Sequence, residues 1–180
     1  MQLDNKILPK VTSGNYRLKL TPLGVEVVGT GVILKGSSIT EHLKDCDSCT
    51  VFSATLGFSA DRQLTTLQHS DLSKALELDA YLNQQIESVC DEFENNINKQ
   101  ARQNNQFTAY RFSPGYGDFS LEYQKDFLML SKNRDIKCTP DYLLLPTKSV
   151  TAIIGISQKV QKCISNKCDF CSFKDNCANK

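Results

Sequence analysis

Four cysteines gather near the carboxyl end of this 180-residue chain. Cys163, Cys168, Cys171 and Cys177 follow the spacing C-x4-C-x2-C-x5-C. Thiolates this close along a chain can converge on one metal ion, and four sulfur ligands suit zinc or an iron–sulfur cluster. The alternative is a set of unconnected reduced thiols. We therefore expect a metal site in this segment and leave zinc and iron–sulfur open.

An arginine followed by a glycine-rich turn is the second candidate. Residues 111–118 read Arg-Phe-Ser-Pro-Gly-Tyr-Gly-Asp. A guanidinium can hold a carboxylate through two parallel hydrogen bonds, and glycines let the backbone approach a ligand closely. Free N–H groups of the turn and the ring of Tyr116 could add hydrogen bonding and stacking. The pattern fits a binding loop or, alternatively, a structural turn with a surface arginine.

A polar stripe marks the longest helix that the sequence predicts, residues 71–100. Asp79, Asn83 and Glu87 are spaced i, i+4, i+8, so they share one side of that helix. On a helical projection, Asp79 and Asn83 fall inside the apolar arc and Glu87 lies just beyond its edge. The stripe is either satisfied by neighbouring backbone or faces a ligand. Its carboxylates invite a cationic partner, because burying an unpaired charge is costly.

Other polar positions carry weaker signals. Residues 145–150 place Lys148 and Ser149 between a proline and an apolar strand, which alone fits an ordinary strand entry. Cys46 and Cys49 form a C-x2-C pair outside any thioredoxin-like pattern, so inert thiols are expected there. His42, His69 and Cys90 match no catalytic motif. We expect the histidines at surface or packing positions and Cys90 in the core.

The composition is that of an ordinary globular protein. Hydrophobic residues make up 40% of the chain and charged residues 23%. The 21 basic and 20 acidic residues give a net charge of +1, which argues against charge-driven binding to nucleic acid or a membrane surface. The sequence shows neither a signal peptide nor a long apolar segment, so we expect a cytoplasmic protein with reduced cysteines.

Helices and strands are predicted to interleave without the regular short connections of a doubly wound fold. Strand signals occupy residues 24–36 as a hairpin, 50–56, 107–112 and 150–156. Helices are expected at 39–44 behind a capping box, from 59, at 71–100 and at 120–131. Residues 1–23 have no clear assignment. These elements predict an α/β protein of the α+β type with a mainly antiparallel sheet over residues 1–160, followed by a cysteine-rich tail over 161–180.

Taken in order, several segments resemble the activation (reactivation) domain of cobalamin-dependent methionine synthase, in its small stand-alone form. The resemblance runs over about residues 30–160, and its most specific parts are Arg-x-x-Pro-Gly-Tyr at 111–116 and Pro-x-Lys-Ser-Val at 146–150. Weaker similarity lies at residues 36–43, 52–57, 78–80 and 86–89.

The resemblance implies a C-shaped domain with a twisted antiparallel sheet and a shallow groove for S-adenosylmethionine. In that reading Arg111 binds the methionine carboxylate and Glu87 approaches the ligand's positive end. The implied ligand contacts are Glu87, Arg111, Pro114, Gly115, Tyr116, Lys148, Ser149, Ile154 and Gly155.

The resemblance also implies a function and a partner. The expected role is an accessory subunit that binds S-adenosylmethionine and serves reductive remethylation of the cobalamin on a separate corrinoid methyltransferase, such as methionine synthase. Two alternatives remain: an electron-transfer module whose cysteine tail reduces a corrinoid protein, or a ligand-binding protein without catalysis. No residue is assigned a catalytic role, and whether the chain is itself an enzyme stays open.

Overall fold

The computed structural model describes residues 7–158 and contains a six-stranded sheet with the strand order β3-β2-β1-β4-β8-β5. Every pair of neighbouring strands is antiparallel, as the sequence predicts. The strands are β1 (Lys10–Thr21), β2 (Gly24–Val27), β3 (Val32–Leu34), β4 (Ser48–Thr55), β5 (Phe107–Thr108) and β8 (Ser149–Ser157). A separate ribbon pairs β6 (Lys137–Cys138) with β7 (Leu144–Leu145). The helices are α1 (Ser37–Leu43), α2 (Phe58–Ser70), α3 (Leu72–Gln103) and α4 (Tyr123–Leu130).

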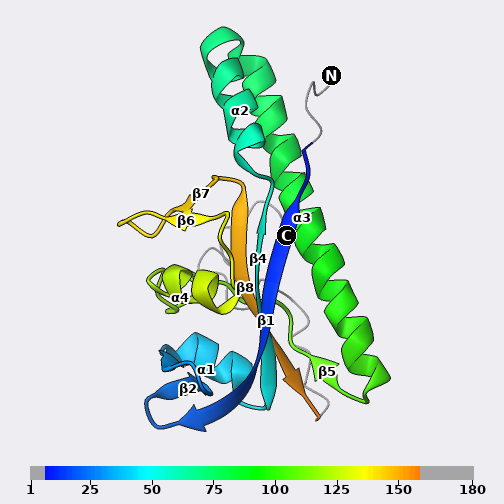
Figure 1. Cartoon of the computed structure of the whole chain (residues 1–180), viewed down its shortest axis with the longest axis vertical. Coiled ribbons are helices and arrows are strands. Elements are labelled where there is room, and N and C mark those ends of the chain that lie inside the picture. The colour runs from blue at the N-terminus through cyan, green and yellow to red at the C-terminus, as the bar shows by residue number, and fades with distance from the viewer. Residues whose placement is uncertain (1–6, 159–180) are drawn as a thin grey trace, which may run out of the picture.

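The sheet has a hydrophobic cluster on each face. Helix α3 lies along one face, and α1, α4 and the β6–β7 ribbon lie on the other (Figure 1). In β4, Val51 faces the α1–α4 side while Phe52 faces α3, and Ile153 and Ile154 of β8 divide in the same way. Because β4 and β8 are covered on both faces, both alternating sets of side chains are largely buried, and they include polar residues such as Thr50, Ser53 and Thr151 as well as apolar ones.

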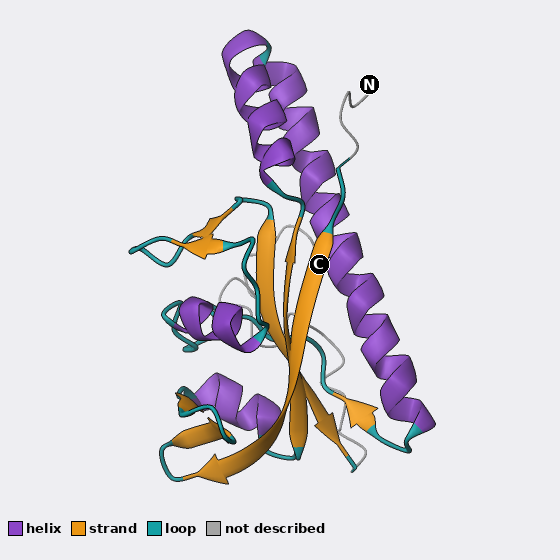
Figure 2. Cartoon of the chain, in the orientation of Figure 1, coloured by secondary structure: helices purple, strands orange, loops and turns teal. Residues whose placement is uncertain are grey.

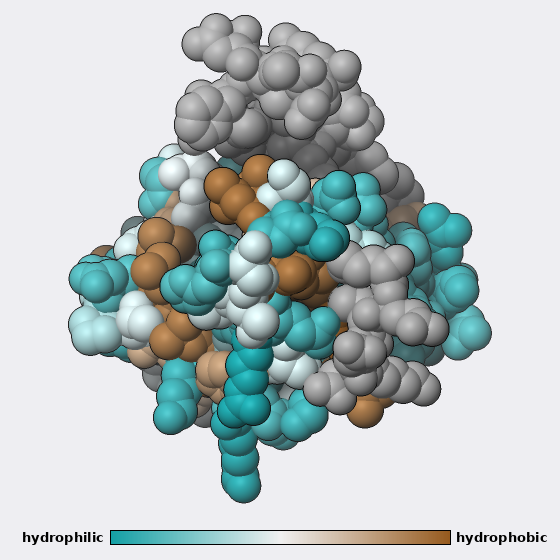
Figure 3. All heavy atoms as spheres, turned by 90° about the horizontal axis from the view of Figure 1, so that it is seen from above, coloured by the Kyte–Doolittle hydropathy of each residue, from teal (hydrophilic) through white to brown (hydrophobic). Residues whose placement is uncertain are grey.

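Helix α3 extends beyond the sheet and forms a projecting hairpin with α2 (Figure 2). Its buried residues where it crosses the sheet include Leu82, Ile86 and Cys90. Leu72 and Leu76, which the helical projection assigns to the apolar face, are instead 66% exposed, because the first turns of α3 lie in the projecting hairpin. Figure 3 looks down on this end and shows apolar surface broken up by polar residues. Among residues 7–158, no helix combines the length and the apolar composition that crossing a membrane requires.

Strand β1 is the longest strand, and the sequence leaves it unassigned. It pairs with β4 through residues 10–17 and with β2 through residues 18–21. Gly14 sits in the middle of it, and a Cβ there would lie 2.3 Å from the carbonyl oxygen of Leu130. The end of α4 therefore packs directly on the strand backbone. A glycine and several polar residues weaken the strand pattern at this position, although the packing requires them.

The strand predicted over residues 107–112 forms only in part. Residues Phe107 and Thr108 make β5, and Phe112 then bridges to Ile153. Thr108 pairs with Ile156, so four steps along this segment lie opposite three steps of β8. One extra residue makes a bulge, and it reverses the faces beyond it. Phe112 thus enters the α1–α4 cluster, and the preceding Arg111 is directed toward α3.

Candidate functional site

The turn after Arg111 is held by its own backbone. Its glycines adopt left-handed conformations, with φ of +96° at Gly115 and +56° at Gly117. The Gly115 N–H donates to the carbonyl of Phe119 at 2.7 Å, and the Tyr116 N–H donates to the carbonyl of Ser113 at 3.2 Å. These two N–H groups are therefore used inside the turn. The sequence-based expectation that they are open to a ligand is not met in this conformation.

Asp118 ties this turn to the start of α1. Its carboxylate accepts hydrogen bonds from the Ser37 N–H at 2.6 Å, the Ser37 hydroxyl at 2.8 Å and the Ser38 N–H at 2.8 Å. The bonds from Ser38 and Ser37 hold the pKa of Asp118 well below its usual range. Helix α1 begins after Gly36 without a capping side chain of its own. The predicted capping box of Ser38 is thus replaced by a carboxylate from a distant turn.

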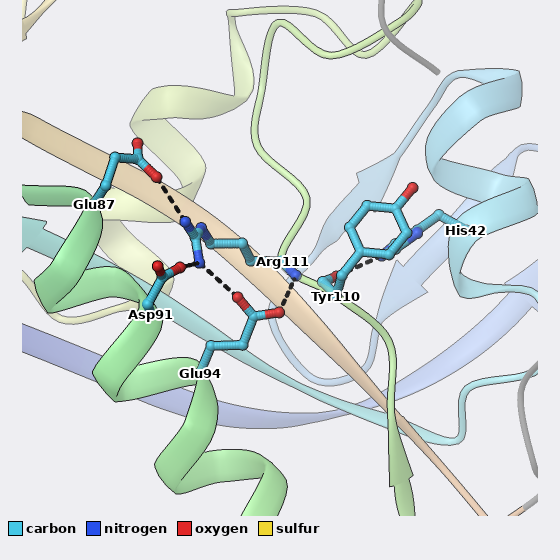
Figure 4. A network of polar contacts seen from close by, with 6 residues as sticks. All are labelled: His42, Glu87, Asp91, Glu94, Tyr110 and Arg111. Carbon is cyan, nitrogen blue, oxygen red and sulfur yellow. Dashed lines mark hydrogen bonds and ion pairs between the residues drawn. The ribbon is translucent and has the colours of Figure 1, made fainter. Parts of the chain in front are cut away.

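Arg111 lies in a cluster of three carboxylates from α3 (Figure 4). Its Nη1 donates to Asp91 at 2.5 Å and to Glu94 at 2.6 Å, and its Nη2 donates to Glu87 at 2.6 Å. The Arg111 side chain is 7% exposed, whereas the side chains of Glu87 and Asp91 are 61% and 55% exposed. The guanidinium is thus buried beneath a carboxylate rim that is open to solvent.

Glu94 has a different position from the other two carboxylates. Its side chain is 18% exposed, and it accepts both from the guanidinium and from the Arg111 backbone N–H, the latter at 3.0 Å. It therefore fixes the main chain and the side chain of Arg111 together. Burial alone lowers the pKa of Arg111, but the hydrogen bonds to Asp91 and Glu94 outweigh it, and the pKa is raised above its ordinary value. Arg111 is permanently charged.

The cluster carries an excess of negative charge. Three carboxylates surround one guanidinium, so the four side chains together have a net charge of −2. Partial burial and the nearby charge of Glu87 raise the pKa of Tyr116, whose phenol is therefore neutral at pH 7. The Tyr116 ring meets the edge of Phe112 with 5.5 Å between centroids and remains half-exposed. A neutral aromatic surface thus borders the anionic rim, an arrangement suited to a flat ring that carries a cation.

His42 packs against the segment of residues 110–112, on the side away from α3 (Figure 4). Its Nε2 donates to the carbonyl of Tyr110 at 3.0 Å, and its ring contacts Tyr110 and Phe112. Burial lowers the pKa of His42 to about 4, so the imidazole is neutral at pH 7. This confirms the expected packing role for His42, while His69 is exposed.

Lys148 forms a second cluster further along α3. Its Nζ donates to Asp79 Oδ1 at 2.6 Å and to Asn83 Oδ1 at 2.7 Å. The polar stripe thus finds the cationic partners that its carboxylates require, Lys148 for Asp79 and Arg111 for Glu87. The stripe borders the buried face instead of entering it, because Asn83 and Glu87 are exposed. Asp79 and Glu87 are about 12 Å apart along the helix axis, so the two clusters are separate.

The other predicted contact residues lie in the turn at 113–118, beside Lys148 or within the sheet. Pro114 is buried within the turn, beside the exposed Gly115. The Ser149 hydroxyl is engaged with Thr55 at 2.8 Å and with the Pro146 carbonyl at 2.6 Å. Ile154 is fully buried on the face that carries α3.

Gly155 faces the opposite side of the sheet from Ile154. A Cβ at Gly155 would lie 2.4 Å from the Cys46 sulfur. Glu87, Arg111 and Ile154 therefore lie on the α3 side of the sheet, whereas the Tyr116 ring packs against Phe112 of the opposite cluster.

The predicted metal ligands Cys163, Cys168, Cys171 and Cys177 lie outside the described residues. Within residues 7–158, no group of three His, Cys, Asp or Glu side chains is arranged to hold a metal ion. Cys49 and Cys90 are buried thiols, and burial raises the pKa of each to about 12. Both thiols are therefore protonated and unreactive at neutral pH, as expected for Cys49 of the C-x2-C pair and for Cys90.

An open depression of about 430 Å³ lies beside the start of α1, the segment to which Asp118 is bonded. It is lined by the β1–β2 turn and the start of α1. Its lining residues are Thr21, Pro22, Leu23, Gly24, Gly36, Ser37, Thr40 and Glu41. It contains none of the residues for which the sequence predicts ligand contacts.

Comparison with known proteins shows a likeness of fold. No protein-family model matches the sequence, and no curated protein sequence matches it. Among solved structures, the chain is similar to the MetH reactivation domain in a crystal structure with bound AdoHcy. The TM-score is 0.61 at 16% sequence identity, over 82% of this chain and 58% of the other. The chain shares the fold of the MetH reactivation domain. It spans less than two thirds of the length of that structure, and the similarity concerns fold alone.

Two carboxylates of the Arg111 cluster are not among the contact residues that the sequence predicts. Asp91 and Glu94 follow Glu87 at i+4 and i+7, which puts all three on one side of a helix. That spacing was visible in the sequence. The partner of these carboxylates could not be predicted, because no local pattern shows that Arg111, 17 positions after Glu94, points at this side of the helix.

Proposed function

We propose that this protein binds S-adenosylmethionine beside Arg111 and acts as an accessory subunit in the reactivation of a cobalamin-dependent methyltransferase such as methionine synthase. The observation that carries the proposal is the shared fold with a MetH reactivation domain bound to AdoHcy. The turn at 113–118 supports it, because it places a half-exposed tyrosine next to an anionic rim on α3.

The chemistry of the site suits this ligand. S-adenosylmethionine combines an adenine ring, a sulfonium cation and an amino acid end with both charges. Tyr116 offers a stacking surface, and Glu87 a negative charge for the cationic part. Arg111 supplies the positive charge for the ligand carboxylate. The cobalamin would belong to the partner protein, which would receive the methyl group.

Calorimetric titration with S-adenosylmethionine tests the proposal. The wild type should bind, and Arg111→Ala should weaken binding by about 2–3 kcal/mol, the scale of a lost charge-assisted hydrogen bond. Lys10→Ala is the control, because it also removes one positive charge but from an exposed ion pair with Asp135. Circular dichroism checks that each variant is folded. Remethylation of a cobalamin-dependent methionine synthase that lacks its own reactivation domain then tests the accessory role. Absence of binding by the folded wild type contradicts the proposal.

A further inference from the structure

Both N–H groups of the Arg111 Nη1 are already engaged by carboxylates of the protein itself. Nη1 serves both Asp91 and Glu94, and Nη2 serves Glu87. A ligand carboxylate that binds Nη1 must therefore replace Asp91 or Glu94. Because all three are negatively charged, they also repel an incoming carboxylate.

The three carboxylates are not equally exchangeable. Glu94 is mostly buried and holds the Arg111 backbone N–H as well as Nη1, so its departure would strand a buried donor. Asp91 shares Nη1 with Glu94, and its side chain is 55% exposed. It can move into water without leaving its charge buried. Glu87 occupies the other nitrogen and leaves Nη1 to the exchange.

We propose that Asp91 is an internal competitor for the ligand carboxylate and that Glu94 is a positioning residue that keeps Arg111 aimed at the site during the exchange. The proposal rests on the proposed function, because it concerns binding at the same guanidinium. In the free protein, Asp91 fills the place on Nη1. In the bound protein, the carboxylate of the ligand takes that place and Asp91 turns into solvent. The competition lowers the affinity for any ligand that carries a carboxylate.

The test compares S-adenosylmethionine with decarboxylated S-adenosylmethionine, two ligands that differ only in the carboxylate. The ratio of their dissociation constants isolates the carboxylate interaction from stacking and from the sulfonium. Asp91→Asn removes the competing charge, so the preference for the carboxylated ligand should rise by about three- to tenfold. Glu94→Gln loosens Arg111 and should reduce this preference.

Glu92→Gln is the matched control. Glu92 lies next to Asp91 on α3, and its side chain is exposed. The change removes the same charge from the same helix, so a general electrostatic effect would appear in both variants. A rise confined to Asp91→Asn supports the exchange.

The outcomes separate the two proposals. If the wild type binds both ligands and Asp91→Asn keeps the wild-type ratio, or lowers it, Asp91 is not a competitor and only this inference is overturned. If the folded wild type binds neither ligand, the proposed function is overturned together with it. Thermal unfolding of each variant confirms that the protein used in the titration is folded.

Discussion

Helix α3 carries two clusters in which a cation meets its side chains, and the two are built differently. Lys148 faces one carboxylate, Asp79, and one neutral amide, Asn83, so that cluster is electrically balanced. Arg111 faces three carboxylates and leaves a net charge of −2. The balanced pair of Lys148 and Asp79 links the residue before β8 to helix α3. In the Arg111 cluster, three carboxylates surround one buried cation, and two of them, Glu87 and Asp91, are mostly exposed.

Replacing each cation by methionine measures this difference, and Arg111→Met should have the largest effect. It leaves the mostly buried Glu94 without its cationic partner and leaves three carboxylates to repel one another. We expect the free energy of unfolding at pH 7 to fall by about 3 kcal/mol. Urea denaturation measures it. A second substitution, Glu94→Gln, should restore part of the loss, and no restoration would contradict the importance of the repulsion.

His42 packs against Tyr110 and Phe112, the two neighbours of Arg111. The pH dependence of stability that His42 causes therefore reports on the segment that carries the Arg111 cluster. The folded pKa of His42 is about 4 and its unfolded pKa about 6.5. The unfolded state therefore binds more protons between these values, and stability falls as the pH falls from about 6.5 to about 4, by about 2–3 kcal/mol. In His42→Gln, which keeps an N–H donor for Tyr110, this decline should disappear. His69→Gln, at an exposed position, should follow the wild-type curve.

Lys148→Met should have a smaller effect than Arg111→Met. Lys148 is mostly buried, but its partners Asp79 and Asn83 reach solvent. We expect a loss of about 1 kcal/mol in the free energy of unfolding. The same urea denaturation provides the number. An effect as large as that of Arg111→Met would remove the distinction between a balanced and an overloaded cluster.

The smallest effect is expected from the carboxylates that anchor the segments beside the two cations. Asp118 anchors the turn after Arg111 to the start of α1. Asp61 accepts hydrogen bonds from the N–H and the hydroxyl of Thr147, the residue before Lys148. The pKa of Asp118 is lowered on folding, so its contribution is present above about pH 4 and is lost as the pH falls below it. Asp118→Asn should destabilise the protein at pH 7 but converge with the wild type in acid. Asp61→Asn, with fewer bonds to lose, should change thermal stability less.

The fold was largely predictable, and the site only in part. Hydrophobic spacing located α3 and β8, because both bury a regular set of side chains. Strand β1 was missed because its centre is a glycine beneath α4. From the sequence, Glu87 and Arg111 are assigned to one ligand only through a family resemblance, Glu87 at its positive end and Arg111 at its carboxylate. The direct contact between them depends on a long-range crossing that no local pattern encodes. The cysteine tail, outside the described residues, stays a prediction.

The bulge before Arg111 makes the connection from Thr108 to Phe112 one residue longer than the part of β8 that it faces. Thr108 and Phe112 are its two anchors, and four steps join them where β8 uses three. A segment shorter by one residue would still reach both anchors with ordinary alternation, and the arginine before Phe112 would still face α3. An added residue would need a second bulge. The register of the sheet is therefore compatible with a connection shorter by one residue, but exchanging Arg111 with Phe112 would turn the arginine away from α3.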